Sequence, residues 1–89
     1  MKAIVTVLGK DRVGIIASVC TLLSENNINI LDISQTILQE NFTMVMYTDL
    51  SACVSPFSAV ADALEKLGAE QGLTIRMQRE DIFNAMHQV

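Results

Sequence analysis

The stretch that decides the fold is AIVTVLGKDRVGIIASVCTLL, residues 3–23. Its first part, Ala3–Leu8, is a short apolar and β-branched run that stops at a glycine, which is typical of a buried strand. After Gly14 the spacing changes, and apolar residues recur every three or four positions, as on one face of a helix. The stretch therefore predicts a strand that leads through a charged loop into a helix, and this helix ends at Asn26 or Asn27.

The next segment predicts a hairpin. Residues 28–37 form a β-like stretch whose apolar phase slips between Ile30 and Leu31, as it does at a bulge. The polar triplet at 39–41 interrupts it, and residues 42–47 then alternate as a third strand. We expect a long, irregular second strand that pairs with the third.

The last third of the chain predicts a helix and a strand. Ser55 and Pro56 favour a helix start, with serine as the N-cap and proline at the first helical position. Either Gly68 or Gly72 ends this helix. Residues 73–77 then alternate apolar and polar side chains, as in a strand with one buried face.

The predicted order is βαββαβ, which is the ferredoxin-like α+β arrangement: a four-stranded antiparallel sheet with two helices on one face. Apolar residues at 82, 83 and 86 add a short C-terminal helix over about 80–88, which packs on its own domain or on a partner. A length of 89 residues suits one hydrophobic core, so we expect a single domain over 1–89.

The composition favours self-association. Hydrophobic residues make up 51% of the chain and charged residues 18%, which leaves little charge to cover the surface of so small a domain. The first three predicted strands also carry apolar residues on both faces: Ile4 and Leu8 oppose Val5 and Val7, and Val45 opposes Met44 and Met46. We expect a homodimer, with a tetramer as the alternative.

Several partners and compartments are disfavoured. The net charge is −4 and the basic residues are scattered, so the chain lacks the positive patch that binds nucleic acid. The two cysteines have no metal-ligand spacing and predict reduced thiols. With no signal peptide and no apolar run of about 20 residues, the sequence predicts a cytoplasmic protein that does not enter a membrane.

The charged loop over residues 9–15, GKDRVGI, is the most informative candidate site. Backbone N–H groups at a helix start favour an anion, Arg12 can pair with a carboxylate, and Asp11 can accept hydrogen bonds from an ammonium group. Those groups complement an amino-acid zwitterion. The alternative is a purely structural loop, in which Asp11 caps the helix and Arg12 is solvated.

The sequence resembles the ACT domain, a small-molecule regulatory module, over essentially its whole length. The resemblance includes the ACT domains of the glycine cleavage system transcriptional repressor and single-domain bacterial ACT proteins. It rests on the 11–15 loop, the pair Asn29-Ile30, Asp32, and the run 42–44.

The resemblance implies that a ligand, commonly an amino acid, lies at a subunit interface, between the loop before the first helix of one chain and the start of the second strand of its neighbour. Val13 stands where the family usually has proline, so the loop is expected to be less rigid. The ligand-binding residues that it implies are Asp11, Arg12, Val13, Gly14, Ile15, Asn29 and Ile30.

Two functions remain open. The first is a regulatory domain that senses an amino acid or related metabolite and acts on a partner protein, which the sequence does not name. The second is a ligand-free interaction or dimerisation module with the same fold. An enzyme is disfavoured, because no nucleophile–base set, phosphate loop or paired-carboxylate motif is present. No catalytic residue, metal ligand or cofactor is predicted.

Overall fold

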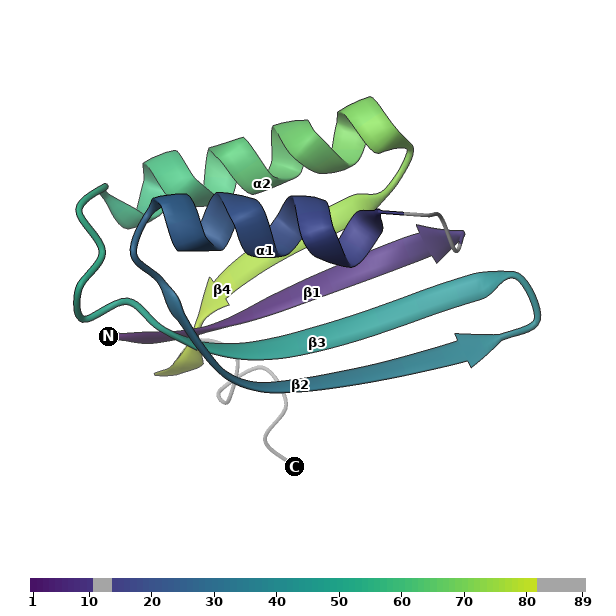
Figure 1. Cartoon of the computed structure of the whole chain (residues 1–89), viewed down its shortest axis with the longest axis horizontal. Coiled ribbons are helices and arrows are strands. Elements are labelled where there is room, and N and C mark those ends of the chain that lie inside the picture. The colour runs from purple at the N-terminus through teal and green to yellow at the C-terminus, as the bar shows by residue number, and fades with distance from the viewer. Residues whose placement is uncertain (11–13, 82–89) are drawn as a thin grey trace.

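The computed structural model describes residues 1–10 and 14–81 and confirms the predicted βαββαβ order (Figure 1). The elements are β1 (Lys2–Lys10), α1 (Ile15–Glu25), β2 (Asn29–Leu38), β3 (Asn41–Asp49), α2 (Phe57–Gln71) and β4 (Thr74–Arg79). The predicted C-terminal helix over about 80–88 lies outside the described residues from residue 82 onward.

The four strands form one antiparallel sheet in the order β2-β3-β1-β4, with α1 and α2 on one face (Figure 1). This is the ferredoxin-like arrangement expected from the sequence. Strands β2 and β4 are the two edges. The other face of the sheet carries no helix among the described residues, and we call it the open face.

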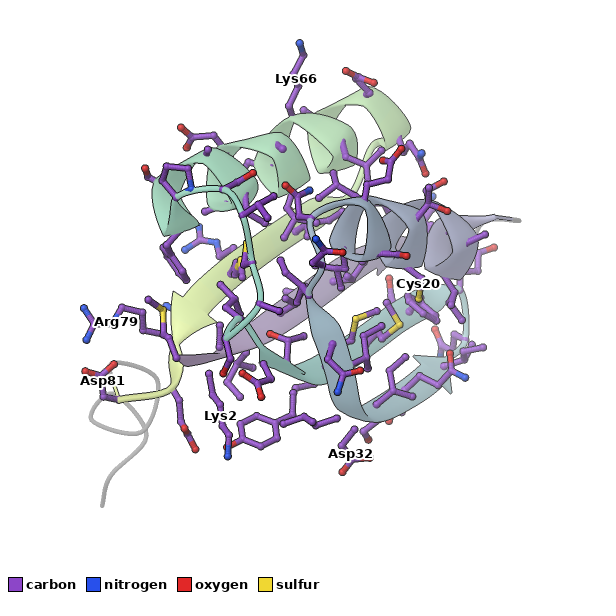
Figure 2. The ribbon with its side chains drawn as sticks, turned by 60° about the vertical axis from the view of Figure 1, so that its left-hand side comes forward. Lys2, Cys20, Asp32, Lys66, Arg79 and Asp81 are labelled. Carbon is purple, nitrogen blue, oxygen red and sulfur yellow. The ribbon has the colours of Figure 1, made fainter. Side chains whose placement is uncertain are left out.

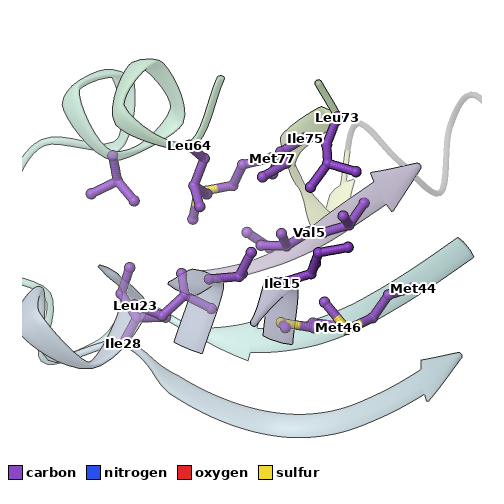
Figure 3. Packing of buried hydrophobic residues seen from close by; sticks show 14 of the residues in the cluster. Val5, Ile15, Leu23, Ile28, Met44, Met46, Leu64, Leu73, Ile75 and Met77 are labelled. Carbon is purple, nitrogen blue, oxygen red and sulfur yellow. The ribbon is translucent and has the colours of Figure 1, made fainter. Parts of the chain in front are cut away.

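The core lies between the sheet and the two helices (Figure 3). Alternate residues of β1 point into it because side chains of a strand alternate between faces. Each helix adds an apolar stripe at three- and four-residue spacing. The fully buried members include Val5, Val7, Val19, Leu23, Met44, Met46, Val60, Leu64 and Ile75.

The predicted bulge in the second strand is confirmed. Pairing between β2 and β3 shifts register between Ile30 and Asp32, so Leu31 is the extra residue. The hairpin then closes at Gln39, whose φ of 57° lies in the left-handed region that tight turns require. The extra residue shifts the alternation of side chains in β2 by one position. As a result, Ile30 before the bulge and Ile33 after it both face the helix side of the sheet.

The predicted N-cap of α2 is wrong. Pro56, and not Ser55, is the N-cap residue, and no side chain caps this helix end. The Ser55 hydroxyl instead donates a 2.8 Å hydrogen bond to the Asn26 side-chain oxygen, and the Asn26 amide donates to the Leu22 carbonyl at 2.8 Å. Ser55 therefore joins the start of α2 to the end of α1, a contact between segments far apart in sequence.

Gly72 ends α2, with a φ of 72° in the left-handed region. Gly68 lies inside the helix and has another role, since a Cβ there would be 2.8 Å from the Leu73 carbonyl oxygen. Its own carbonyl accepts a 2.7 Å hydrogen bond from the Leu73 N–H. Gly68 therefore allows α2 to approach the start of β4 closely.

Candidate functional site

The predicted site residues fall into two groups, and the first lies at the start of α1. Gly14 is exposed, has a φ of 87° and occupies the N-cap position without any side-chain hydrogen bond. A Cβ at this position would meet no described atom within 4 Å, so the glycine is required by the backbone conformation and leaves open space beside the helix end. Asp11, Arg12 and Val13 lie outside the described residues.

At the start of α1, only the backbone of Ile15 is available to a ligand, and its side chain is not. Its side chain is only 2% exposed and packs in the core. A ligand at the start of α1 would therefore meet the N–H groups of the first helical turn, which have no partner within the helix. The buried side chain fixes the position of that turn against the sheet.

The second group lies at the start of β2. Asn29 is exposed and pairs with Asp49, which in turn pairs with Lys2. Ile30 is half-buried and packs against the core. Asn29 is thus the member of this pair whose side chain is available to a ligand.

One chain does not bring the two groups together. Gly14 follows the end of β1 that pairs with Asn41, whereas Asn29 pairs with Asp49 of β3, which in turn pairs with Lys2 at the beginning of β1 (Figure 1). The eleven residues of α1 separate them, a length of about 16 Å at 1.5 Å per residue. An amino acid is much shorter than that, so a ligand that touches both groups must do so across two chains.

Sequence patterns did not reveal the edge strand β2 as an apolar surface. Ile33 and Ile37 pair with the buried Met46 and Phe42, so they face the helix side, yet they are 39% and 56% exposed. Leu31 at the bulge is 44% exposed. The helices leave this margin of the sheet uncovered, and strand order, which sets the edge, is not readable from periodicity.

A polar cluster occupies the open face near the Asn29 end. The Tyr47 hydroxyl donates a 2.6 Å hydrogen bond to Glu80, and the Lys2 ammonium lies 5.7 Å from the centre of the Tyr47 ring. Figure 2 shows Lys2 and Asp32 on the side of the sheet away from the helices. Sequence analysis did not single out Tyr47 or Glu80, because only the sheet register brings them together.

The electrostatics of this cluster shift two pKa values. The hydrogen bond to Glu80 raises the pKa of the Tyr47 phenol, helped by desolvation and by the negative charges of Glu80 and Asp49. Hydrogen bonds from the Ser51 hydroxyl and N–H lower the pKa of Asp49. Both shifts follow from local contacts of exposed or half-exposed groups, which is typical of a surface network.

The described residues offer no metal site. Across residues 1–10 and 14–81, no three His, Cys, Asp or Glu side chains gather where they could hold a metal ion. The cysteines Cys20 and Cys53 are free and half-buried. Within the same residues, neither helix is long and apolar enough to cross a membrane.

A shallow hollow lies between the two helices. Its volume is about 390 Å³, and it opens widely to solvent. Neither Gly14 nor Asn29 lines it, so it is separate from both groups of predicted site residues. Its lining residues are Ala17, Ser18, Thr21, Leu22, Glu25 and Leu67.

Residues 2–78 match the family model of the ACT domain. The chain belongs to the ACT domain family. ACT domains are regulatory ligand-binding domains, so the family confirms the resemblance and supports a regulatory, non-catalytic role. The match includes both groups of predicted site residues. It also covers all four strands, except for Arg79 at the end of β4.

Individual proteins agree with this family. A UPF0237 protein of Clostridium acetobutylicum is 57% identical over 89 residues, which is the full length of both chains. The solved ACT domain protein from Streptococcus pneumoniae is 41% identical, with a TM-score of 0.81 over 98% of each chain. A solved protein assigned as a glycine cleavage system transcriptional repressor is 26% identical, with a TM-score of 0.72 over 86% of this chain and 44% of its own.

Proposed function

We propose that this ACT domain is a regulatory domain that binds an amino acid or related metabolite between two copies of the chain and passes the bound state to a partner protein. The observation that carries the proposal is that Gly14 and Asn29 lie beyond opposite ends of α1 within one chain. A site that uses both residues needs a second copy.

The edge strand β2 supports a specific way to form that site. Its exposed Leu31, Ile33 and Ile37 would leave water if the β2 strands of two copies paired antiparallel. An antiparallel pair places the beginning of one strand beside the end of the other. Because Gly14 lies near the end of β2 and Asn29 at its beginning, this pairing brings Gly14 of one copy toward Asn29 of the other.

The chemistry of these groups favours a zwitterionic ligand. The first turn of α1 offers N–H groups and the positive end of a helix dipole to a carboxylate. The sequence adds Arg12 for the carboxylate and Asp11 for an ammonium group. The Asn29 side chain would supply one donor and one acceptor from the other copy.

A ligand-free interaction module is the second candidate. The exposed apolar side chains of β2 favour it, because they need a protein partner whether or not a metabolite binds. In this case β2 recruits a second copy or another protein, and the loop before α1 has only a structural role.

A thermal-shift screen of wild type, Asp11→Ala and Asn29→Ala against the standard amino acids tests the proposal. A ligand at 100 times its Kd stabilises the folded state by about 2.7 kcal/mol, which raises the Tm of a domain of this size by roughly 10 °C or more. We expect one amino acid to raise the Tm of wild type, and each variant to lose the shift.

The matched control is Asp62→Ala, which removes an exposed carboxylate of α2 that belongs to neither group and should keep the shift. A screen in which no amino acid moves the Tm of wild type at millimolar concentration contradicts ligand binding and favours the interaction module. A shift that survives in both Asp11→Ala and Asn29→Ala places the ligand elsewhere.

A further inference from the structure

Strand β4 is an edge of the sheet, and α2 packs along it (Figure 1). On its inner side β4 pairs with β1, whereas no strand within residues 1–10 and 14–81 pairs with its outer side. The N–H and C=O groups of an edge strand that point away from the sheet have no partner in it. Strand β4 therefore presents a row of backbone groups with which an added strand can pair.

Two hollows follow this edge, in the angle between β4 and α2. Their volumes are about 210 and 320 Å³, and both open to solvent. Glu65 and Arg76 line both of them, so the hollows are neighbours, and we call the pair the β4 groove. Its other lining residues are Ala61, Ala69, Leu73, Thr74, Ile75, Met77 and Gln78.

The wall of the β4 groove that α2 forms has nearly the repeat of a strand. Ala61, Glu65 and Ala69 follow at four-residue spacing, a rise of about 6 Å along a helix. Alternate residues of a strand are about 6.6–6.8 Å apart. Ala61 lies with Met77 in one hollow, and Ala69 lies with Leu73 in the other. Alternate side chains of an added strand can therefore meet successive positions of α2, where the two alanines leave room for apolar groups.

The β4 groove carries one charge of each sign. Glu65 and Arg76 are exposed, and neither makes a hydrogen bond or an ion pair with another residue in the part of the chain that the structure describes. Glu65 belongs to the helix layer, whereas Arg76 pairs with Thr6 and lies on the open face. An added strand therefore meets a negative charge on its helix side and a positive charge on its other side.

A second copy of β4 fits this edge poorly. Only side chains on the same face lie opposite each other in an antiparallel pair, so a symmetric pair that uses most of β4 is centred on residue 75, 76 or 77. The two Arg76 side chains are then directly opposite or diagonal neighbours, within about 8 Å. Like charges this close oppose the pairing.

We propose that the β4 groove docks an extended segment of a partner protein, which adds a strand beside β4. This segment turns apolar side chains and one basic side chain toward α2, with the basic group against Glu65. On its other side it carries an acidic group against Arg76. Backbone pairing supplies affinity, and the hollows and charges supply specificity. Charge complementarity distinguishes this occupant from a second copy.

This inference rests on the proposed function in one respect, since it names the surface that receives the partner protein. It assigns different roles to the two edges of the sheet, with β2 for a second copy and β4 for the partner. Docking at β4 does not require a metabolite. The peptide test is therefore made without one, and its failure would leave the outcome of the thermal-shift screen unaffected.

Two capped peptides of identical composition test the docking, and NMR of the ¹⁵N-labelled full-length protein is the readout. The first, TVTKDVTVT, has its lysine on the same side as its valines and its aspartate on the other side when extended. The second, TVTDKVTVT, exchanges the lysine and the aspartate. It therefore places a carboxylate against Glu65 and an ammonium group against Arg76.

We expect the first peptide to shift the amide signals of residues 74–79 and to bind at least about tenfold more tightly than the second, because the second reverses both charge contacts. In the double variant Glu65→Lys with Arg76→Glu, this preference should reverse. The matched control is Lys66→Glu with Glu70→Lys, which also exchanges two exposed charges of α2 but lies outside the β4 groove. It should keep the preference of wild type.

Three outcomes would overturn the proposal. No amide shifts at millimolar peptide, or shifts confined to β2, would mean that the β4 edge does not accept a strand. Equal affinities of the two peptides for wild type would remove the charge recognition. Signals of β4 that move with protein concentration in the absence of peptide would mean that a second copy occupies this edge.

Discussion

The hydroxyl of Tyr47 donates a 2.6 Å hydrogen bond to the carboxylate of Glu80, which lies 33 positions later in the chain. Tyr47 belongs to β3 and Glu80 follows β4, so the bond spans the intervening strand β1. It joins the Asn29 end of the open face to the residue that directly follows β4. It is therefore a tertiary contact between β3 and the residue that follows β4.

Glu80→Gln should lower the pKa of Tyr47 toward the usual value near 10, because it removes a charged acceptor that favours the protonated phenol. The chain has one tyrosine and no tryptophan, so the phenolate absorbance during an alkaline titration reports this group alone. Glu70→Gln, on the exposed side of α2, is the control and should leave the midpoint unchanged. Equal midpoints in wild type and Glu80→Gln would contradict the contact.

The same contact predicts a pH dependence of stability. Because the folded-state pKa of Tyr47 is raised, its contribution to the free energy of unfolding is fully present below the unfolded pKa near 10. The contribution is lost as the pH rises through the folded pKa. Denaturant unfolding across this range should show a steeper alkaline loss of stability in wild type than in Glu80→Gln.

Gly68→Ala should destabilise the domain although alanine is the better helix former. The new Cβ would lie 2.8 Å from the Leu73 carbonyl oxygen and 3.2 Å from the Ile75 nitrogen, and these backbone atoms belong to the packed start of β4. Overpacking of this kind costs about 1–3 kcal/mol, against a gain of about 1 kcal/mol in helix propensity. We expect a lower Tm by calorimetry.

Ala69→Gly is the comparison for that variant, because residue 69 is exposed on the same helix. It should show only the helix-propensity loss of about 0.5–1 kcal/mol. A Gly68→Ala protein that melts above wild type would show that α2 and β4 do not approach as closely as described.

The β2 edge predicts the oligomeric state. Wild-type protein should have a mass by light scattering of at least twice the 9.8 kDa protomer. Ile37→Lys places a charge on the exposed edge and should shift the mass toward that of one chain, since a desolvated charge opposes edge pairing. The measurement is made at micromolar concentration.

Val54→Lys is the matched control for Ile37→Lys. Val54 is 75% exposed in the segment between β3 and α2, away from the β2 edge. It should keep the mass of wild type. A wild-type monomer, or equal masses for the two variants, would remove the two-chain ligand site.

Most of the fold could be predicted because local patterns set it. The period of two in 73–77, the helical spacing after Gly14 and the phase slip after Ile30 each matched an observed element or irregularity. The N-cap of α2 could not be predicted correctly. Ser55 has the residue type of a cap, but its hydroxyl bonds to Asn26, and only the packing of α2 beside the end of α1 brings that partner within reach.

The candidate site could be predicted in its residues but not in its geometry. The sequence drew attention to Gly14 and Asn29, and the structure places them at opposite ends of α1. Spacing along the chain does not show this separation, because it depends on which strands pair. Tyr47 and Glu80 were not predicted, since neither residue has a local pattern that indicates the other.

By itself the sequence determined the class and order of elements, the bulge in β2 and the ACT family, because hydrophobic periodicity and short motifs act over a few neighbouring residues. Only the tertiary structure decided which strands lie at the edges, which isoleucines remain exposed, that Gly68 is a contact point, and that Tyr47 meets Glu80. Those features arise from strand order and register, which are set by packing between residues distant in sequence.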